Sequence, residues 1–486
     1  MWRRRRSGGE DRPVRIVAAA ALLWAAPAAA QVADTTAGPV RGVTEGGLTE
    51  GKRIVFRGIP FAAPPLGALR WTPPAPVARW RGVRDARRPA RACIQQDHGW
   101  NRADHAFRAE DCLTLDVGTA ALSGRRPVLV WIHGGGNYAG SPGDMAAGPL
   151  VDRGIVVVGV RYRLGALGFL VRRGVAGGNW ALQDQIAALR WVRANIARFG
   201  GDPGRVTIAG ESAGAQDVGL LLAAPAARGL FARAILGSGT PGFGIPWRSR
   251  GAAERMGAPL ATMRRAGADD VFAAGERLAD PLLAGQDYRW LRTTIDGVVL
   301  PRAPDRLLAE APARDVMIGT NAFELDLPGG AGQRDRFIVQ SYGAKAPLAR
   351  AYYRLDRPAP PADPRRGTRD QQIATDATFG CPAQRLARLL AGRGARVWSY
   401  RFDGSDDGGM TRHSAELPYI YGGKPIGGVA VMDYWANFIR TGDPNGGALP
   451  RWPAFDAAGS RIEIDNQGVR AAREATGGIC QWSDTL

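Results

Sequence analysis

The sequence predicts an α/β protein in which a predominantly parallel sheet carries helices on both faces. Short runs of apolar, mostly β-branched residues recur along the chain and alternate with stretches of helical spacing, which is typical of parallel strands joined by helices. One run ends in Gly-x-Ser-x-Gly, and an earlier one ends in three consecutive glycines. Both endings belong to the carboxyl ends of predicted strands, where such sheets hold their functional groups.

The first residues have the composition of a secretory signal peptide. The first 15 residues are rich in arginine, and an apolar stretch from Ile16 to Ala26 follows them. Ala28 to Ala30 then provide the small residues of a cleavage site. The apolar stretch is too short to span a bilayer, which needs roughly 20 apolar residues. We therefore expect an exported protein, secreted or periplasmic, with a signal peptide at residues 1–30, no membrane span and a single domain at 31–486.

The remaining chain presents its elements in the order of such a fold. The Pro-rich residues 58–67 cannot be helical and are expected along the surface. Residues 241–295 and 328–375 are rich in Arg, Ala, Pro and Gly and weakly periodic, so we expect helical and loop insertions there rather than a further domain. The predicted strands cover residues 53–56, 127–132, 154–161, 206–209, 231–236, 316–319 and 396–401, and a predicted helix covers 183–199.

Ser212 stands at the centre of the sharpest turn that the sequence predicts. The run that begins at Val206 ends in Gly210-Glu211-Ser212-Ala213-Gly214, and a helix is expected directly afterwards. In this kind of turn the serine takes a strained conformation, and its hydroxyl is exposed at the helix N-terminus, where negative charge is stabilised. With 66 glycines in the chain the pentapeptide alone is a weak signal. The flanking strand and helix make Ser212 a candidate nucleophile.

A serine nucleophile of this kind needs a base and an acid, which follow it in chain order. His413 is the candidate base, because it is the only one of the four histidines that lies downstream of Ser212. The acid is less clear among many carboxylates. Glu324, in the loop after a predicted strand, is the best candidate, with Asp326 two residues on and Asp296 in a predicted turn as rivals.

The glycine triplet supplies candidate donors for an oxyanion. Gly134 to Gly136 follow a buried strand and present N–H groups that no side chain obstructs, and the N–H of Ala213 completes the set. The alternative is a plain glycine loop. The position of the triplet ahead of the turn at Ser212, with His133 leading it, favours the oxyanion hole.

Four cysteines in an exported protein favour disulfides over metal ligation. The positions of the four cysteines in the sequence leave three disulfide pairings open. No Cys-x-x-Cys or His-Glu-x-x-His spacing indicates a metal site, and a serine nucleophile needs no cofactor.

The formal net charge of +19 raises the question of a nucleic-acid partner. Part of this charge lies in the signal segment, and the other arginines are expected to be scattered over a solvated surface without a basic run interleaved with aromatics. No nucleic acid is therefore expected as a partner. The charge could still draw anionic substrates or surfaces towards the protein at low salt.

Several motifs together resemble one family. They are Phe56 to Ala62, Glu110 to Leu115, His133 to Gly136, Tyr162 to Phe169, Phe199 to Gly214, Gly319 to Asn321, His413 to Tyr419, Trp435 to Phe438 and Thr441 to Asn445. The chain resembles the type-B carboxylesterases, a family of α/β-hydrolase fold that includes cholinesterases and bacterial esterases. The resemblance runs from about Gly38 to Trp482, which is almost the whole chain after the signal segment.

The resemblance implies a role for particular residues. It places a triad at Ser212, Glu324 and His413, oxyanion donors at Gly135, Gly136 and Ala213, a supporting hydroxyl at Ser238, and disulfides that join Cys93 to Cys112 and Cys381 to Cys480. The chain departs from the family pattern at four positions. The family usually has an aromatic at Asn137, Asn at Arg161, Gly at Leu325 and a small residue at Asp217. The first two changes are expected to alter the acyl pocket and the packing at the sheet edge, and the last two the surroundings of the acid.

These features predict an exported serine carboxylesterase that hydrolyses a small-molecule ester through an acyl-enzyme intermediate. A non-catalytic adhesion protein of the same fold is one alternative, against which Ser212 and His413 argue. A basic polyanion-binding protein is another. Trp100, between the first two cysteines, invites comparison with the aromatic choline site of cholinesterases, but its spacing to Cys112 fits poorly, and a packing role is the stronger hypothesis.

Overall fold

The computed structural model describes residues 31–46, 52–283, 289–327, 329–474 and 478–483. The predicted signal peptide, residues 1–30, lies outside this part. The strands are β1 Gln31–Asp34, β2 Pro39–Glu45, β3 Arg53–Pro60, β4 Arg84–Asp85, β5 Ala92–Cys93, β6 Arg108–Ala109, β7 Thr114–Thr119, β8 Arg126–Ile132, β9 Val156–Val160, β10 Gly201–Glu211, β11 Arg233–Gly237, β12 Asp315–Asn321, β13 Val397–Asp403, β14 Arg461–Asp465 and β15 Gly468–Ala472.

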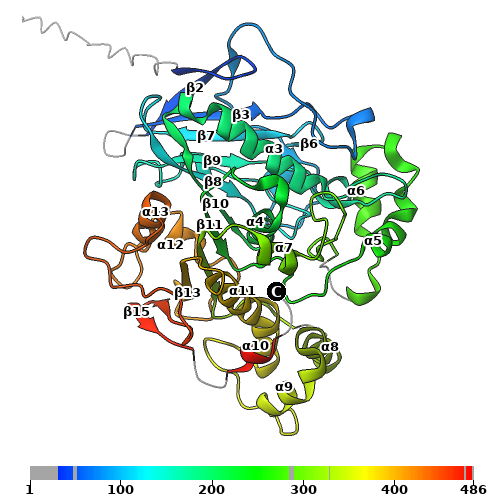
Figure 1. Cartoon of the computed structure of the whole chain (residues 1–486), viewed down its shortest axis with the longest axis vertical. Helices are drawn as coiled ribbons and strands as arrows, with labels where there is room; N and C mark the ends of the chain where they lie inside the picture. The colour runs from blue at the N-terminus through cyan, green and yellow to red at the C-terminus, as the bar shows by residue number, and fades with distance from the viewer. Residues whose placement is uncertain (1–30, 47–51, 284–288, 328, 475–477, 484–486) are drawn as a thin grey trace, which may run out of the picture.

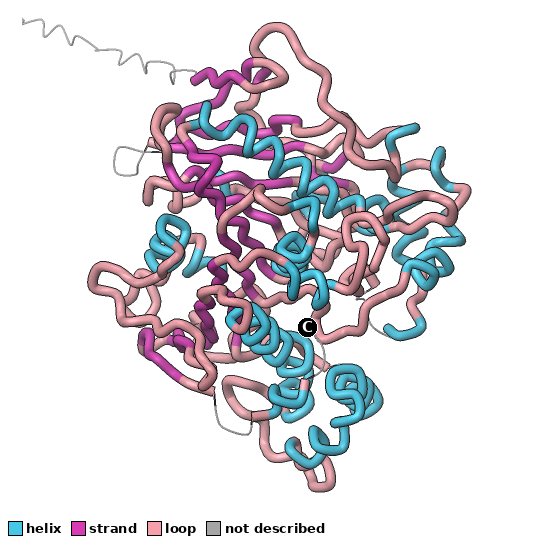
Figure 2. Tube along the Cα trace, viewed as in Figure 1, coloured by secondary structure: helices cyan, strands magenta, loops and turns pink. Residues whose placement is uncertain are grey.

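One large sheet organises the molecule. Among the described residues it has 13 strands, in the order β1-β2-β3-β7-β9-β8-β10-β11-β12-β13-β14-β15, with β4 beside β2. Neighbours from β9 to β14 run parallel, and the strands outside them pair antiparallel, except that β4 pairs parallel with β2. Figure 2 shows these strands as one band through the middle of the molecule, with helices beside it. The predicted parallel centre is confirmed, and antiparallel strands extend it at both edges.

Helices follow most of the parallel strands. They are α1 Arg102–Ala106, α2 Gly165–Phe169, α3 Trp180–Asn195, α4 Ala213–Ala223, α5 Arg250–Gly257, α6 Ala268–Glu276, α7 Pro304–Glu310, α8 Gly330–Tyr342, α9 Ala346–Tyr352, α10 Arg369–Thr375, α11 Cys381–Ala391, α12 Leu417–Ile420 and α13 Met432–Thr441. The region 241–295 holds α5 and α6, and 328–375 holds α8 to α10. Figure 1 shows α8, α9 and α10 grouped at the end of the molecule below α11.

The sheet separates two apolar layers, because successive side chains of a strand point to opposite faces. In β8, Val128 and Val130 belong to the cluster that includes residues of α3, α4, α7 and α11. Leu129 and Trp131 belong to the cluster that includes residues of α12 and α13. All four of these β8 side chains are buried. Helices on both faces therefore bury the central strands, which explains their continuous apolar sequences.

The expectation that residues 58–67 lie along the surface is wrong for their first half. The strand β3 continues through a bulge to Pro60, and Ile59 pairs with Leu115 of β7. Ile59 and Phe61 are buried. A proline is tolerated here because it ends the strand, where its missing N–H costs no ladder bond.

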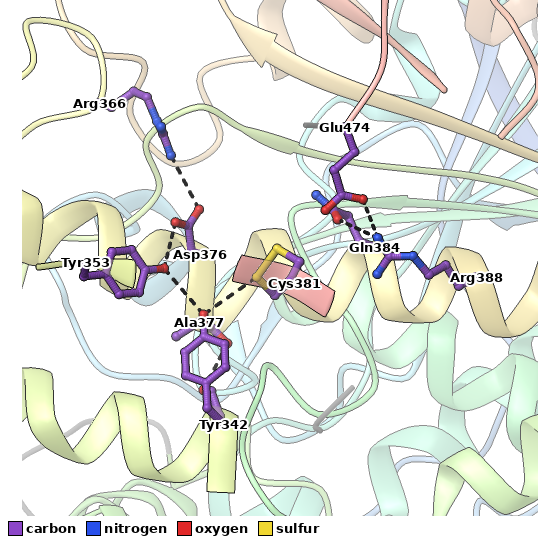
Figure 3. Close-up of a disulfide and its surroundings, with 11 residues drawn as sticks. Tyr342, Tyr353, Arg366, Asp376, Ala377, Cys381, Gln384, Arg388 and Glu474 are labelled. Carbon is purple, nitrogen blue, oxygen red and sulfur yellow. Dashed lines mark hydrogen bonds and ion pairs between the residues drawn. A yellow bond between two sulfur atoms is a disulfide. The ribbon is translucent and has the colours of Figure 1, made fainter. Parts of the chain in front are cut away.

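Both disulfides implied by the family resemblance are present, Cys93–Cys112 and Cys381–Cys480. The second joins the first residue of α11 to the segment near the C-terminus. Figure 3 shows Cys381 beside Tyr342, whose hydroxyl lies 3.8 Å from its sulfur, and near Asp376, which accepts a hydrogen bond of 2.9 Å from Tyr353. In the part of the chain described, no helix is long and apolar enough to cross a membrane.

Candidate active site

Ser212 occupies the turn between β10 and α4, as the sequence predicts. Its φ is +57° and its ψ is −127°, a conformation that non-glycine residues rarely adopt. The turn is tight: a Cβ on Gly210 would lie 2.3 Å from the carbonyl carbon of Gly214. The Ser212 N–H donates to the Gly237 carbonyl at the end of β11 (2.9 Å), which holds the strained turn against the sheet. Its hydroxyl is thereby presented at the N-terminus of α4.

His413 lies beside Ser212 although 201 residues separate them. It sits in the loop between β13 and α12, at the same edge of the sheet as the end of β10. Its Nε2 is 2.9 Å from Ser212 Oγ, within hydrogen-bond distance. On the opposite side of the ring, Nδ1 is 2.7 Å from Glu324 Oε2. The three side chains therefore form one continuous hydrogen-bonded chain.

Glu324 follows β12 and is 3% exposed. Its second carboxylate oxygen, Oε1, accepts hydrogen bonds from the Ser238 hydroxyl (2.6 Å) and the Asn321 N–H (2.7 Å). Its backbone N–H donates to Thr375 Oγ1 (3.2 Å). These contacts fix the carboxylate in one orientation, with Oε2 directed at His413.

The rival carboxylates are engaged elsewhere. Asp326 is exposed and accepts a hydrogen bond of 2.6 Å from Gln371. Asp296 is buried, and its Oδ1 accepts from the backbone N–H groups of Val298 (3.1 Å) and Leu300 (2.9 Å). Asp296 therefore stabilises its own turn, and Glu324 is the carboxylate that the structure brings to Nδ1 of His413.

Two further buried carboxylates surround His413, and sequence reasoning gave neither a role. Glu211 precedes Ser212, and its Oε1 lies 3.3 Å from His413 Nε2 and accepts from the Ser414 hydroxyl (2.6 Å). Glu416 accepts a bond of 2.7 Å from the Asn321 side chain. Both residues lie within the sequence motifs that contain Ser212 and His413. Their closeness to these residues in the sequence was the signal that could have identified them.

This arrangement shifts the pKa of His413. Burial alone lowers the pKa, but the carboxylates of Glu211 and Glu324 raise it by more, so that the net shift from 6.5 is upward. Burial and the charges of Glu211 and Glu324 raise the pKa of Glu416 to about 8. By contrast, burial lowers the pKa of His133 to about 4, so this histidine stays neutral.

The glycine loop presents free N–H groups next to Ser212. Gly135 has φ +98° and Gly136 φ +63°, and a Cβ on Gly134 would lie 3.1 Å from Ser212 Cβ. Among the hydrogen bonds of the described residues, none is donated by the N–H of Gly135, Gly136 or Ala213. Three unpaired donors thus flank the serine hydroxyl, which suits them to a developing negative charge.

These groups open into a cavity of about 760 Å³. Its described wall is largely aromatic and aliphatic, and the described side chains that line it include no Arg or Lys. Trp100 lines its mouth with 62% of the residue exposed, so it is not a packing residue of the core. The apolar lining residues are Trp100, Trp131, Tyr138, Pro142, Met145, Phe243, Ile245, Leu291, Leu325, Phe379 and Leu417.

No cluster of three or more metal-ligating side chains occurs in the described ranges.

Known proteins share this sequence and architecture. Residues 29–481 match the profile of the carboxylesterase family. The chain is 33% identical to liver carboxylesterase of Sus scrofa, over 96% of this chain and 95% of that protein. It is 32% identical to fumonisin B1 esterase of Sphingopyxis macrogoltabida, over 92% and 91% of the two chains. The chain belongs to the carboxylesterase family.

A solved structure agrees with this assignment. A PNB esterase matches the fold of this carboxylesterase with a TM-score of 0.80 at 27% identity, and the match covers 93% of this chain and 99% of that one. The fold is that of the α/β hydrolases, as predicted, and the protein is a hydrolase of carboxylic esters.

The four departures from the family pattern have distinct surroundings. Arg161 forms a buried double hydrogen bond with Asp116 (2.9 and 3.0 Å). Leu325 lines the cavity. Asn137 and Asp217 contact each other behind the glycine loop (3.4 Å). The expected disturbance of the acid by Asp217 is therefore absent, because this side chain hydrogen-bonds to Asn137 and Gln185 instead of approaching Glu324.

Proposed function

We propose that this carboxylesterase is an exported enzyme that cleaves esters with Ser212 as nucleophile, His413 as base and Glu324 as acid. The unbroken hydrogen-bonded chain from Ser212 Oγ through the imidazole to Glu324 Oε2 is the observation that carries the proposal. It lies at the floor of a cavity large enough for an organic ester.

Acylation begins when His413 Nε2 takes the proton of the Ser212 hydroxyl as Oγ attacks the ester carbonyl carbon. The carbonyl π electrons move to oxygen, and the N–H groups of Gly135, Gly136 and Ala213 stabilise the resulting oxyanion. When the oxyanion collapses, the bond to the alcohol oxygen breaks, and the imidazolium returns its proton to the alcohol. Water then attacks the acyl-enzyme by the same path and releases the acid and Ser212.

Glu324 stabilises the imidazolium and keeps the Nδ1 proton of His413 on its own side of the ring. Ser238 and the Asn321 N–H support this role, because both donate to Oε1 and leave Oε2 for His413. The substrate is an ester with apolar groups and no anionic group, since the described wall of the cavity is mainly apolar and includes no Arg or Lys side chain.

Export is proposed from the signal segment together with the disulfides, which persist in oxidising compartments. Cleavage after Ala30 would keep the described strand β1, Gln31–Asp34, in the mature chain. Residues 31–486 would then form one catalytic domain.

Ser212→Ala tests the nucleophile. We expect hydrolysis of p-nitrophenyl esters to fall by at least about 1,000-fold while the far-ultraviolet circular dichroism is unchanged, because only the attacking hydroxyl is lost. Peptide mapping after treatment with a fluorophosphonate should find the label on Ser212 alone. Ser249→Ala, an exposed helix-cap serine, is the matched control and should be labelled and active like the wild type.

Label on another serine, or substantial turnover by Ser212→Ala, would contradict the assignment. Binding of DNA that weakens steeply with salt, without hydrolysis of aryl esters, would instead support the polyanion-binding alternative.

A further inference from the structure

A buried polar cluster lies directly behind the glycine loop and takes no part in the mechanism above. It consists of Asn137 from the loop, Gln185 from α3, and Gln216 and Asp217 from α4, and each of the four is at most 1% exposed. Asn137 and Asp217 are two of the positions at which the chain departs from its family. Their side chains are in direct contact.

Asn137 holds a backbone conformation that needs support. Its φ is +62°, and it follows Gly135 and Gly136, which also have positive φ. Glycine adopts this region without steric cost, whereas the backbone of Asn137 is strained there, although asparagine tolerates it better than most residues. The Asn137 carbonyl accepts a hydrogen bond of 2.7 Å from the Gly165 N–H. Its side chain supplies the second anchor.

The side chain of Asn137 connects the loop to α4. Its Nδ2 lies 3.3 Å from Gln216 Oε1 and 3.4 Å from Asp217 Oδ1. Gln216 is itself fixed, because its Nε2 donates to the Leu291 carbonyl at 2.5 Å. The helix α4 begins at Ala213. The contact therefore joins the segment that carries the Gly135 and Gly136 donors to the helix that carries the third donor.

Asp217 lies in surroundings that disfavour its negative charge. It forms no ion pair with any described residue, and burial raises its pKa to about 7. The titratable group that faces it is Tyr162, which follows β9 and donates to the His133 carbonyl. The glycine loop and α3 face it with amides, those of Asn137 and Gln185.

The contact with Gln185 fits a protonated carboxyl group. Asp217 Oδ2 and the Gln185 amide nitrogen are 2.5 Å apart, a separation typical of O–H···O rather than N–H···O bonds. The Gln185 oxygen, Oε1, is buried without a partner among the described residues. Rotation of this amide by 180° would place Oε1 against Asp217, where it could accept the carboxyl proton.

We propose that Asp217 is a positioning residue that holds Asn137 and thereby keeps the N–H donors of the glycine loop aligned with the N–H of Ala213. This proposal rests on the proposed function. It adds that the geometry of the oxyanion hole depends on a side chain that never touches the substrate.

The test compares variants per active site, counted by titration with a fluorophosphonate, so that loss of folded protein does not mimic loss of rate. Asn137→Gly removes the amide yet permits positive φ, and it should fold. We expect Asn137→Gly and Asp217→Ala each to lower kcat by about 10- to 100-fold, with KM changed less than about 3-fold, because the donors act mainly in the transition state.

Further variants separate positioning from a general structural role. Asp217→Asn has the shape and neutrality of the acid and should stay within about 3-fold of wild-type kcat. The double variant should lose little more than the worse single variant, because both changes break one connection. Asn195→Ala, which removes another buried and doubly hydrogen-bonded asparagine, is the control and should keep kcat per site.

Asn137→Gly and Asp217→Ala with wild-type kcat per titrated site would overturn the proposal and leave the proposed function standing. The proposal is equally overturned if Asp217→Asn loses as much rate as Asp217→Ala. A wild-type protein without ester turnover and without label on Ser212 would overturn the proposed function, and this inference with it.

Discussion

His413 is the residue on which the local charges converge. Its ring faces Glu324 on one side and Glu211 on the other, and Glu416 lies behind them. Glu324 and Glu211 are almost fully buried, so water screens their charges little, whereas the raised pKa of Glu416 keeps that group largely protonated near neutral pH. Under the proposed mechanism, the imidazolium formed when Ser212 loses its proton is therefore stabilised by two carboxylates, those of Glu324 and Glu211.

This charge distribution predicts the pH dependence of the enzyme. A base must be neutral to accept a proton, and the raised pKa of His413 means that it becomes neutral only above the ordinary value of 6.5. The acid limb of kcat/KM should therefore have its midpoint above pH 6.5. Glu211→Gln removes one of the charges that raise this pKa, so the limb should move to lower pH.

A pH series of kcat/KM with a neutral ester measures both midpoints. Asp202→Asn, a change at the opposite end of β10, serves as the control and should leave the limb in place. A wild-type midpoint below pH 6.5, or no movement in Glu211→Gln, would contradict the role given to these carboxylates.

Glu324→Gln tests the acid. The new amide can still accept from Ser238 and Asn321 through its oxygen, which directs its NH₂ group at His413 Nδ1 and favours the wrong imidazole tautomer. We expect kcat to fall by roughly 10²- to 10⁴-fold with KM little changed.

Asp326→Asn is the matched control for Glu324→Gln, because Asp326 is exposed and bonded to Gln371. Steady-state kinetics of the two variants should differ by at least about tenfold in kcat. Equal rates, or the larger loss in Asp326→Asn, would assign the acid elsewhere.

At the scale of elements, a break in helical geometry lies beside Glu324. The helix that begins as α10 continues through a π-helical turn, Asp376–Gly380, into α11. Thr375 at its start accepts from the Glu324 N–H, and Phe379 within it lines the cavity. Such turns occur often at functional sites, because the extra residue redirects neighbouring side chains.

The Cys381–Cys480 disulfide fastens this same helix. It closes a loop of 99 residues, whereas Cys93–Cys112 closes one of 19. If chain entropy dominates, its removal by paired Cys→Ala changes should lower the free energy of unfolding by about 1.5 kcal/mol more than removal of the shorter one. Denaturant unfolding of the two double variants measures the difference, and a larger loss from the Cys93–Cys112 variant would contradict it.

At the scale of the whole molecule, charge is distributed unevenly between exterior and site. The chain carries +19, yet no Arg or Lys side chain lines the described cavity. Many arginines are held in ion pairs, including the buried pairs Arg161–Asp116 and Arg163–Asp184. The basic composition therefore shapes the surface and the packing, while the reacting groups work in an acidic and apolar setting.

Export can be tested on the complete chain. When the full sequence is expressed with a secretion pathway, mass spectrometry of the exported protein should find Gln31 at the N-terminus, because the small residues Ala28 to Ala30 precede it. The protein should contain no free thiol by Ellman's reagent before reduction. An uncleaved N-terminus or titratable thiols in the native protein would contradict this prediction.

The sequence by itself determined the fold class and most of the candidate site. Strand runs and the turn at Ser212 are local patterns, since backbone sterics and burial act between near neighbours in the chain. Elimination sufficed for His413, because the chain has so few histidines. Residue patterns alone ranked Glu324 first among its rivals but left them open, and the resemblance to the family selected it.

Only the tertiary structure decided how distant segments meet. Three features show this: Glu211 lies beside His413, Asn137 contacts Asp217, and Ile59 is buried. Each depends on contacts between residues that are far apart in the chain. Their energies depend on exact distances and on exclusion of water, which no local pattern encodes. A carboxylate such as Asp217 looks like a surface charge in the sequence, and only its position inside the fold makes it a buried acid behind the glycine loop.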